Sequence, residues 1–208
     1  MAIPTIPGKE VTVPDIPITD NVGLPADKTV VIVVDMQNDF VKPEGSLHVE
    51  AAAGTIPSIQ NLLEAARQAG VRVVYTQDTS YEGDPEWDIW PRHCERDTWG
   101  WEIVEDLAPQ SKQEMVFVKN RYDGFYGTSL DHYLNNLWGV EHVVIVGTVS
   151  NICVLHTAAS AGLRWFRIVV PADGISSMTE FDQALTLRQI TMLYGGRVVK
   201  STGDVTFE

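Results

Sequence analysis

Residues 143–154 read Val-Val-Ile-Val-Gly-Thr-Val-Ser-Asn-Ile-Cys-Val, an apolar run followed by a short stretch of small and polar residues that leads to a cysteine. The run predicts a buried β-strand, and residues 153–162 predict a helix. Cys153 is therefore expected in the first turn of a helix that directly follows a strand. A helix N-terminus favours negative charge and can lower the pKa of a thiol. The alternative is a buried cysteine that acts only as a small apolar side chain.

Two other predicted strands also end in a side chain that carries chemistry. Asp35 follows the apolar run 30–34, and Lys119 follows the run 115–118. Because the carboxyl ends of parallel strands share one edge of a sheet, where ligands bind, both side chains are expected near Cys153. Taken alone, Asp35 can be a turn residue and Lys119 a solvated charge. Together the three residues predict an acid, a base and a nucleophile at one site.

The alternation of apolar strands with helical patterns predicts an α/β fold. We expect three layers, with helices on both faces of an open, mainly parallel, six-stranded sheet of Rossmann-like type. The strands are expected near residues 29–35, 71–77, 115–119, 142–147, 167–171 and 197–200. The helices are expected near 55–69, 128–138, 151–162 and 179–194. The long irregular stretch 79–100 has the length of a functional or mobile loop.

The pattern indicates a single domain over residues 29–208, preceded by an extended arm over residues 1–28. The arm holds five prolines, at positions 4, 7, 14, 17 and 25. Proline breaks helices and biases the residue before it toward extended conformations. The arm is expected to be either a loose tail or a segment that lies on this subunit or on a neighbour.

Composition excludes several classes of partner. The formal net charge of −13 repels phosphate groups, so neither a nucleic acid nor an anionic membrane is expected as a partner. No apolar run approaches the ~20 residues that span a bilayer, and no signal peptide is evident. We therefore expect a cytoplasmic protein whose two cysteines are free thiols. The turn 35–40 has no glycine, and no P-loop or Gly-x-Ser-x-Gly motif occurs, which excludes the common nucleotide-binding and serine-hydrolase patterns.

Several short motifs occur together along the chain. They are Asp-x-Gln-x-Asp-Phe at 35–40, Trp-Pro-Arg-His-Cys at 90–94, Lys119, Tyr-Asp-Gly-Phe-Tyr-Gly-Thr at 122–128 and Cys-Val at 153–154. In this combination the chain resembles the isochorismatase-like cysteine hydrolases from about residue 30 to 201. That family includes nicotinamidases, N-carbamoylsarcosine amidohydrolases and ureidoacrylate amidohydrolases. The resemblance implies the isochorismatase-like fold and a homodimer or homotetramer, in which the arm 1–28 is expected to reach over a neighbouring subunit; the alternative is a disordered tail on a monomer.

The resemblance also implies roles for the residues at the strand ends. Asp35 would be the general base, Lys119 its partner and Cys153 the nucleophile. The oxyanion hole would be formed by the backbone N–H groups of Val149 and Cys153, with a cis peptide bond between Thr148 and Val149. Members of the family that hydrolyse isochorismate typically lack the cysteine, so Cys153 favours cleavage of a C–N bond through a thioester.

The chain departs from the nicotinamidase pattern at the metal site. Asp78 and His93 match two of its ligands, but Ser80 stands where a further histidine is expected. Zinc normally takes three or four protein ligands. We therefore expect that no cofactor is required and that Asp78 and His93 bond to each other or to water, with zinc or another divalent metal as the alternative.

Four further residues are candidates for contact with a substrate. Phe40, Trp90 and Tyr126 match positions that line the pocket in the family, although isolated aromatic residues are by default core residues. Such a wall would suit a small, flat amide or ureido compound. Arg121 can bind a substrate carboxylate in a bidentate manner or form a structural ion pair.

The residues and the resemblance predict an amidohydrolase that acts on a small carbamoyl, ureido or carboxamide compound and releases ammonia or an amine. The alternatives are a nicotinamidase-type activity and a catalytically silent, oligomeric scaffold of the same fold. A redox sensor is a third class, and it would require Cys94 as the resolving thiol. The sequence leaves the identity of the amide open.

Overall fold

The computed structural model describes residues 12–208, and the predictions that fall on residues 1–11 lie outside the described residues. Its main element is an eight-stranded sheet with the strand order β1-β9-β7-β6-β3-β4-β5 and with β8 paired to β6. All of these pairs are parallel. The strands are β1 (Ile18–Thr19), β3 (Thr29–Val34), β4 (Arg72–Asp78), β5 (Met115–Lys119), β6 (His142–Thr148), β7 (Arg167–Pro171), β8 (Ile175–Ser176) and β9 (Arg197–Val199).

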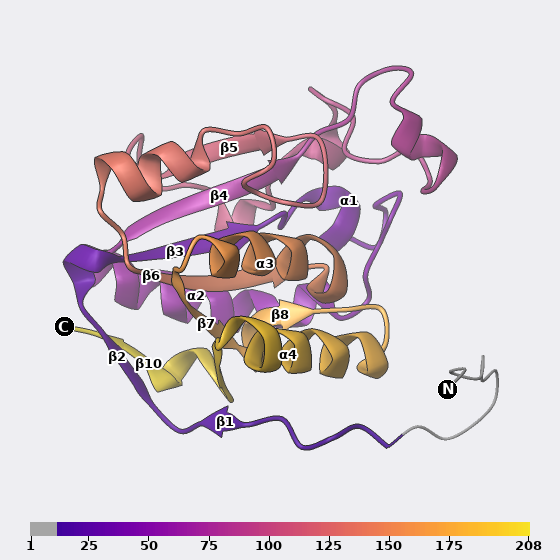
Figure 1. Ribbon diagram of the computed structural model, residues 1–208. Helices are drawn as coiled ribbons and strands as arrows, with labels where there is room; N and C mark the ends of the chain where they lie inside the picture. Colours follow the sequence, from indigo (N-terminus) through magenta and orange to yellow (C-terminus); the bar gives the residue numbers. More distant parts are fainter. Residues whose placement is uncertain (1–11) are drawn as a thin grey trace.

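Helices cover both faces of this sheet, which confirms the predicted three-layer α/β fold (Figure 1). α2 (Ala52–Gln68) lies on one face, and α3 (Leu155–Leu163) and α4 (Glu180–Tyr194) lie on the other. The central strand β3 is buried at every position, and its residues alternate between the two faces. Val31 and Val33 pack in the cluster with α2, and Ile32 packs in the cluster with α3 and α4.

The six predicted strands are all present, but two short strands of the main sheet and both strands of a second, two-stranded sheet were not predicted. β1 and β8 are only two residues long, too short for a hydrophobic period to be visible in the sequence. The helical predictions differ in detail. The predicted helix 128–138 is π-helical over His132–Leu137, and the predicted helix 151–162 begins as a π-helical turn, Ser150–Val154, that continues into α3. The short helix α1 (Asn38–Val41) follows β3.

Part of the predicted arm packs against the domain of the same chain. β2 (Val22–Leu24) pairs with β10 (Val205–Phe207) in a second, two-stranded sheet, and β1 pairs with β9 at the edge of the main sheet. The side chains of Val22 and Leu24 are buried in the same core as α2. Residues 18–24 therefore form part of the domain, because their apolar side chains and backbone groups are satisfied within the same chain. A reach over a neighbouring subunit stays a prediction. Within residues 12–208, no helix combines the length and the apolar character that crossing a bilayer requires.

Candidate active site

Three strand ends bring the predicted acid, cation and thiol together. Asp35 follows β3, Lys119 ends β5 and Cys153 lies in the π-helical turn after β6. The Lys119 Nζ atom lies 2.7 Å from Asp35 Oδ2 and donates to Cys153 Sγ at 3.6 Å. The exposed fractions of the three residues are 0%, 1% and 5% for Asp35, Lys119 and Cys153. The arrangement is therefore a buried ion pair in direct contact with a thiol.

The Asp35 carboxylate is held by the strand beside it. Its Oδ1 atom accepts a hydrogen bond of 2.7 Å from Thr76 Oγ1 in β4. Its Oδ2 atom contacts Lys119 but accepts no well-aligned hydrogen bond from the residues that the structure describes. The backbone of Asp35 has φ = 50°, in the left-handed region that aspartate tolerates better than most residues. Asp35 thus has one oxygen fixed and one oxygen available to a proton.

Gly147 allows the end of β6 to approach the end of β3 closely. A Cβ atom at this position would lie 2.1 Å from the carbonyl oxygen of Val34, and the glycine has φ = 118°. Only glycine fits such an approach. The next peptide bond, between Thr148 and Val149, is cis. Val149 and Cys153, the residues of the predicted oxyanion hole, both line a cavity above the thiol.

Burial sets the protonation of the thiol. It raises the pKa of Cys153 well above the ordinary value, and the opposing effect of the Lys119 ammonium is smaller. The net shift of this pKa is therefore upward, opposite in direction to the lowering that a helix N-terminus can give. Burial raises the pKa of Asp35 as well, more than the neighbouring Lys119 lowers it. For Lys119 burial acts downward, but the carboxylates of Asp35 and Asp78 raise its pKa well above the ordinary value.

Asp78 connects this cluster to His93. Its Oδ1 atom lies 3.1 Å from Lys119 Nζ, and its Oδ2 atom lies 3.4 Å from His93 Nε2. Burial raises the pKa of Asp78, but Lys119 and His93 outweigh burial and lower it below the usual value. Burial lowers the pKa of His93, whereas Asp78 and the carbonyl of Pro91, 2.6 Å from Nδ1, raise it more. Asp78 is therefore an ionised bridge between a lysine and a histidine.

The cavity above the thiol is small and mainly apolar. It is lined by side chains from five separate segments: Phe40, Leu47, Asp78, Trp90, His93, Tyr122, Val149, Ile152 and Cys153. Its volume of about 20 Å³ leaves room for about one water molecule. A substrate therefore has to displace some of these side chains when it enters.

Phe40 and Trp90 line the cavity, but the other two predicted contact residues do not. Tyr126 is 66% exposed and lies outside the cavity wall. Tyr122 takes the expected place, and its hydroxyl accepts a hydrogen bond of 2.9 Å from Trp90 Nε1. Both tyrosines lie in one motif, but a turn lies between them. In this turn Tyr126 N donates to Asp123 O. Arg121 forms the structural ion pair instead, with its Nη1 atom 3.3 Å from Asp84 Oδ1.

The polar residues after Asp35 hold the loop that covers the cavity, a role that the sequence analysis missed. The Gln37 side chain accepts from Asp78 N at 2.7 Å and donates to Asp78 O at 2.9 Å. Asn38 Nδ2 donates to Trp99 O at 2.8 Å. Asp39 Oδ2 accepts from Cys94 N at 2.7 Å. The sequence does contain a sign of this role. Gln37, Asn38 and Asp39 are three consecutive polar residues shortly after a fully buried strand. Buried polar groups need hydrogen-bond partners, so such a run indicates contacts with another segment.

Comparison with known proteins identifies the family. Residues 29–203 match the model of the isochorismatase domain. The chain belongs to the isochorismatase family. It is similar to a ureidoacrylate amidohydrolase from Caulobacter segnis, with 32% identity over 85% of this chain and 83% of that protein. Among solved structures it is similar to N-carbamoylsarcosine amidase from Thermoplasma acidophilum, with a TM-score of 0.75, 36% identity, and coverage of 83% of this chain and 95% of that chain. The predicted family and the hydrolase class are therefore confirmed.

Some structures of the isochorismatase family contain zinc. One similar structure is the pyrazinamidase of Pyrococcus horikoshii in complex with zinc, with a TM-score of 0.75, 27% identity, and coverage of 83% of this chain and 98% of that chain. In residues 12–208 of the present chain, no three histidine, cysteine or acidic side chains are grouped as metal ligands. Both Asp78 oxygens face cations, and the Ser80 hydroxyl donates to the carbonyl of His93. The residues present therefore do not fit a zinc ion.

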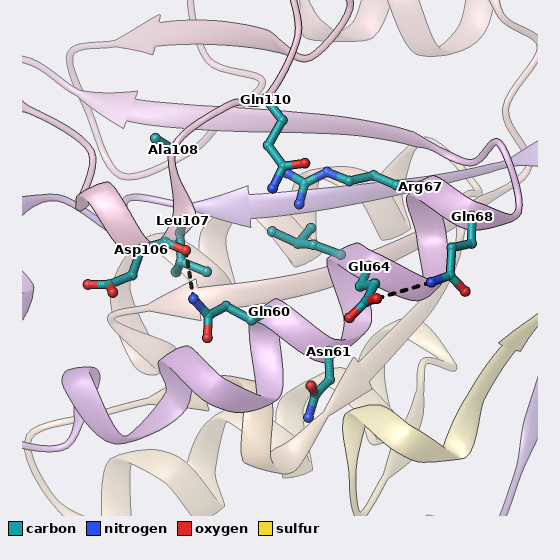
Figure 2. A pocket seen from close by; sticks show the side chains of 10 residues that line it. Gln60, Asn61, Glu64, Arg67, Gln68, Asp106, Leu107, Ala108 and Gln110 are labelled. Carbon is teal, nitrogen blue, oxygen red and sulfur yellow. Dashed lines mark hydrogen bonds between the residues drawn. The ribbon is translucent and has the colours of Figure 1, made fainter.

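A larger hollow of this isochorismatase-family domain lies elsewhere (Figure 2). It measures about 510 Å³ and is lined by polar residues of α2 and by residues 106–110. Gln60 Nε2 donates to Asp106 O at 2.9 Å, and Gln68 Nε2 donates to Glu64 Oε1 at 3.1 Å. Figure 2 shows no thiol or histidine among the residues that line it. This hollow therefore lacks the thiol and the histidine that line the smaller cavity.

Proposed function

We propose that this protein is a cysteine-dependent amidohydrolase that cleaves a C–N bond of a small carbamoyl, ureido or carboxamide compound. The observation that carries the proposal is the contact of one buried ammonium with both a carboxylate and a thiol. Lys119 Nζ lies 2.7 Å from Asp35 Oδ2 and 3.6 Å from Cys153 Sγ. This group lies at the floor of an aromatic cavity, which is the usual character of a small-molecule site.

The resting site holds a neutral thiol. Because burial raises the pKa of Cys153, the thiol keeps its proton until it attacks. Asp35 is the base, since its Oδ2 atom is not occupied by a well-aligned hydrogen bond and since Asp35 and Cys153 contact the same Lys119 ammonium. In the first step the proton moves from Sγ to Asp35 Oδ2 while sulfur bonds to the carbonyl carbon of the substrate. The carbonyl electron pair moves to oxygen and forms a tetrahedral oxyanion.

The oxyanion is stabilised by the backbone N–H groups of Val149 and Cys153. Such donors typically contribute about 2.7–4 kcal/mol each in acyl-transfer enzymes. When the oxyanion collapses, the C–N bond breaks, and Asp35 gives its proton to the departing nitrogen. Ammonia or an amine leaves, and the acyl group remains on Cys153 as a thioester.

Water completes the turnover. Asp35 takes a proton from a water molecule, whose oxygen attacks the thioester carbon. Collapse of the second tetrahedral intermediate breaks the C–S bond and returns the proton to sulfur. The product is a carboxylic or carbamic acid, and the thiol and the carboxylate are restored. Lys119 stays protonated throughout, because two carboxylates face it.

Relatives of the family support this reaction class. Their names describe a ureidoacrylate amidohydrolase, an N-carbamoylsarcosine amidase and a pyrazinamidase, all of which act on C–N bonds. The presence of Cys153 and the buried Asp35–Lys119 pair argues against a catalytically silent scaffold. The resemblance to pyrazinamidase keeps a nicotinamidase-type activity as the second candidate, supported by the flat aromatic walls of Phe40, Trp90 and Tyr122.

The proposal is tested by release of ammonia. The purified protein is incubated with nicotinamide, pyrazinamide, ureidoacrylate, biuret and N-carbamoyl amino acids, and ammonia is measured with a coupled enzyme. We expect turnover of at least one compound, and we expect Cys153→Ala to abolish it. Intact-mass spectrometry of a rapidly quenched reaction should show the acyl adduct on Cys153 and not on Cys94. A folded Cys153→Ala protein that retains more than a few per cent of the rate would contradict the proposal.

A further inference from the structure

Among the described residues, each lysine and arginine in three segments around the cavity has a carboxylate partner. This holds for the loop over the cavity, for the turn after β3 and for the end of β5. The pairs are Lys42–Asp106 at 3.4 Å, Arg92–Glu95 at 2.5 Å, Arg96–Asp97 at 3.9 Å, Lys119–Asp35 at 2.7 Å and Arg121–Asp84 at 3.3 Å. His93 is paired with Asp78. A negatively charged ligand would therefore have to compete with a carboxylate of the protein for each of these cations.

Arg121 is the cation that the sequence analysis offered to a substrate carboxylate. Its Nη1 atom lies 3.3 Å from both Asp84 oxygens and 3.6 Å from Glu86 Oε2. The side chains of Asp84 and Glu86 are 7% and 8% exposed, so the two carboxylates are largely shielded from water, whereas the Arg121 side chain is 40% exposed. Removing the arginine from two buried carboxylates would leave them uncompensated, which is strongly unfavourable. Arg121 is therefore not available to bind the carboxylate of a substrate.

Negative charge accumulates behind the cavity wall. Glu86 is buried, and both its burial and the nearby Asp78 carboxylate raise its pKa. Tyr122, which lines the cavity, acts in the opposite direction and lowers the pKa of Glu86. Residues 79–102, which form the covering loop, contain seven acidic residues and two arginines. The carboxylates Asp35, Asp78, Asp84 and Glu86 thus outnumber the cations Lys119, Arg121 and, when it is protonated, His93.

The rest of the cavity wall offers no compensation to an anion. Phe40, Leu47, Trp90, Val149 and Ile152 contribute mainly apolar surface. A carboxylate that enters such a site loses its hydration and gains no counter-ion, which is costly. An uncharged amide or urea loses much less, and its N–H groups can donate to the Asp78 carboxylate. The backbone N–H groups of the proposed oxyanion hole bind the reacting carbonyl oxygen and are not free for a second anionic group.

We propose that this active site accepts uncharged primary amides and ureas and discriminates against substrates that carry a carboxylate. This inference deepens the proposed amidohydrolase function and rests on it. It separates this chain from the activity that the name ureidoacrylate amidohydrolase describes, because ureidoacrylate is an anion at neutral pH. The substrate class that we expect is a small, flat, neutral carboxamide or urea.

The first test needs no turnover. Iodoacetamide and iodoacetate alkylate thiols and differ only by replacement of a neutral amide with a carboxylate. The rates of Cys153 modification are measured for both reagents by peptide mapping, and their ratio is divided by the ratio for 2-mercaptoethanol. We expect a residual preference for iodoacetamide of at least about tenfold, which corresponds to about 1.4 kcal/mol. A corrected ratio of one or below would overturn the inference.

A variant in which the positive charge of Arg121 has no carboxylate partner gives the matched control. Asp84→Asn with Glu86→Gln removes both partners of Arg121 and leaves the guanidinium free beside the cavity wall. We expect this double variant to modify Cys153 faster with iodoacetate and to lose most of the preference. Adding Arg121→Gln should restore it. A preference that stays the same in all three proteins would show that the charge of this cluster does not set it, and would overturn the inference.

The substrate test separates failure of the inference from failure of the proposed function. N-carbamoylglycine and its methyl ester share the reacting ureido group and differ in one negative charge. We expect kcat/KM for ammonia release to be at least about tenfold higher with the ester. Faster release from the free acid would overturn the inference and leave the amidohydrolase proposal intact. If no amide or urea of either charge yields ammonia or an acyl adduct on Cys153, the amidohydrolase proposal fails, and the alkylation ratio still decides the charge preference.

Discussion

Replacing Lys119 by methionine tests the electrostatic balance of the site. Methionine is similar in length to lysine but carries no charge. In the protein, Lys119 Nζ lies 2.7 Å from Asp35 Oδ2 and 3.1 Å from Asp78 Oδ1, and all three side chains are at most 9% exposed. The Lys119→Met variant therefore leaves two buried carboxylates that face each other without the cation between them. We expect a large loss of stability near neutral pH.

The size of the loss follows from the burial of the pair. Removing one partner of a buried ion pair costs about 3–5 kcal/mol. For a domain of this size, 1 kcal/mol lowers Tm by about 2–4 °C, so the melting temperature should fall by about 6–20 °C. Without Lys119, the folded-state pKa values of Asp35 and Asp78 rise above their values in the unfolded chain. Groups with raised pKa values stabilise the fold at low pH and lose that contribution as pH rises, so the deficit should shrink between neutral pH and about pH 5.

Differential scanning calorimetry across this pH range measures both effects. The parent protein sets the reference at each pH value. The double variant with Asp35→Asn removes one uncompensated carboxylate, and it should recover part of the lost Tm near neutral pH and show a weaker dependence on pH. A Tm within about 2 °C of the parent, with no change in the deficit on acidification, would refute the reasoning, because about 2 °C corresponds to less than 1 kcal/mol.

Three further outcomes are expected. Asp35→Asn should abolish ammonia release and slow alkylation of Cys153, because the proton acceptor is lost; alkylation at the parent rate would contradict that role. Activity should survive dialysis against EDTA, because Asp78 and His93 do not form a metal site with a third ligand; stoichiometric zinc by elemental analysis, with activity lost on chelation, would reverse this. Light scattering should show a homodimer or homotetramer, and a protein that starts at Ala26 should be less stable because it lacks the Val22 and Leu24 contacts; a monomeric mass or an unchanged Tm would count against these expectations.

The fold could be predicted because the strands are long, apolar and regularly spaced. β3 and β6 are buried at every position, and this burial is visible in the sequence as an uninterrupted run of β-branched residues. The two-residue strands β1 and β8 carry no such signal. The packing of residues 22–24 against the domain was not predicted, for a similar reason. Val22 and Leu24 stand among prolines and glycine, so their burial depends on the distant strand β10, which local sequence does not reveal.

The proximity of Asp35, Lys119 and Cys153 could be predicted because parallel topology brings three strand ends to one edge of the sheet. Side-chain direction and side-chain pairing could not be predicted in the same way. Tyr122 and Tyr126 are equally aromatic in the sequence, and only the intervening turn decides that Tyr122 faces the cavity. Arg121 was open to two roles until Asp84 and Glu86, more than thirty residues earlier in the chain, proved to be its partners. Long-range pairs of this kind depend on how a loop folds back, which has no local pattern.

The raised pKa values of Asp35 and Cys153 have one common cause and one mechanistic consequence. Burial penalises a negative charge on either group, so a third negative charge beside Asp35 and Asp78 is strongly disfavoured. Moving the proton from Cys153 to Asp35 leaves the number of charges constant, and the negative charge passes from Asp35 to sulfur. Lys119 Nζ is in contact with both atoms, at 2.7 Å and 3.6 Å, so it stabilises the charge on either side of the transfer. The thiolate is therefore expected to form as the substrate is attacked and not before.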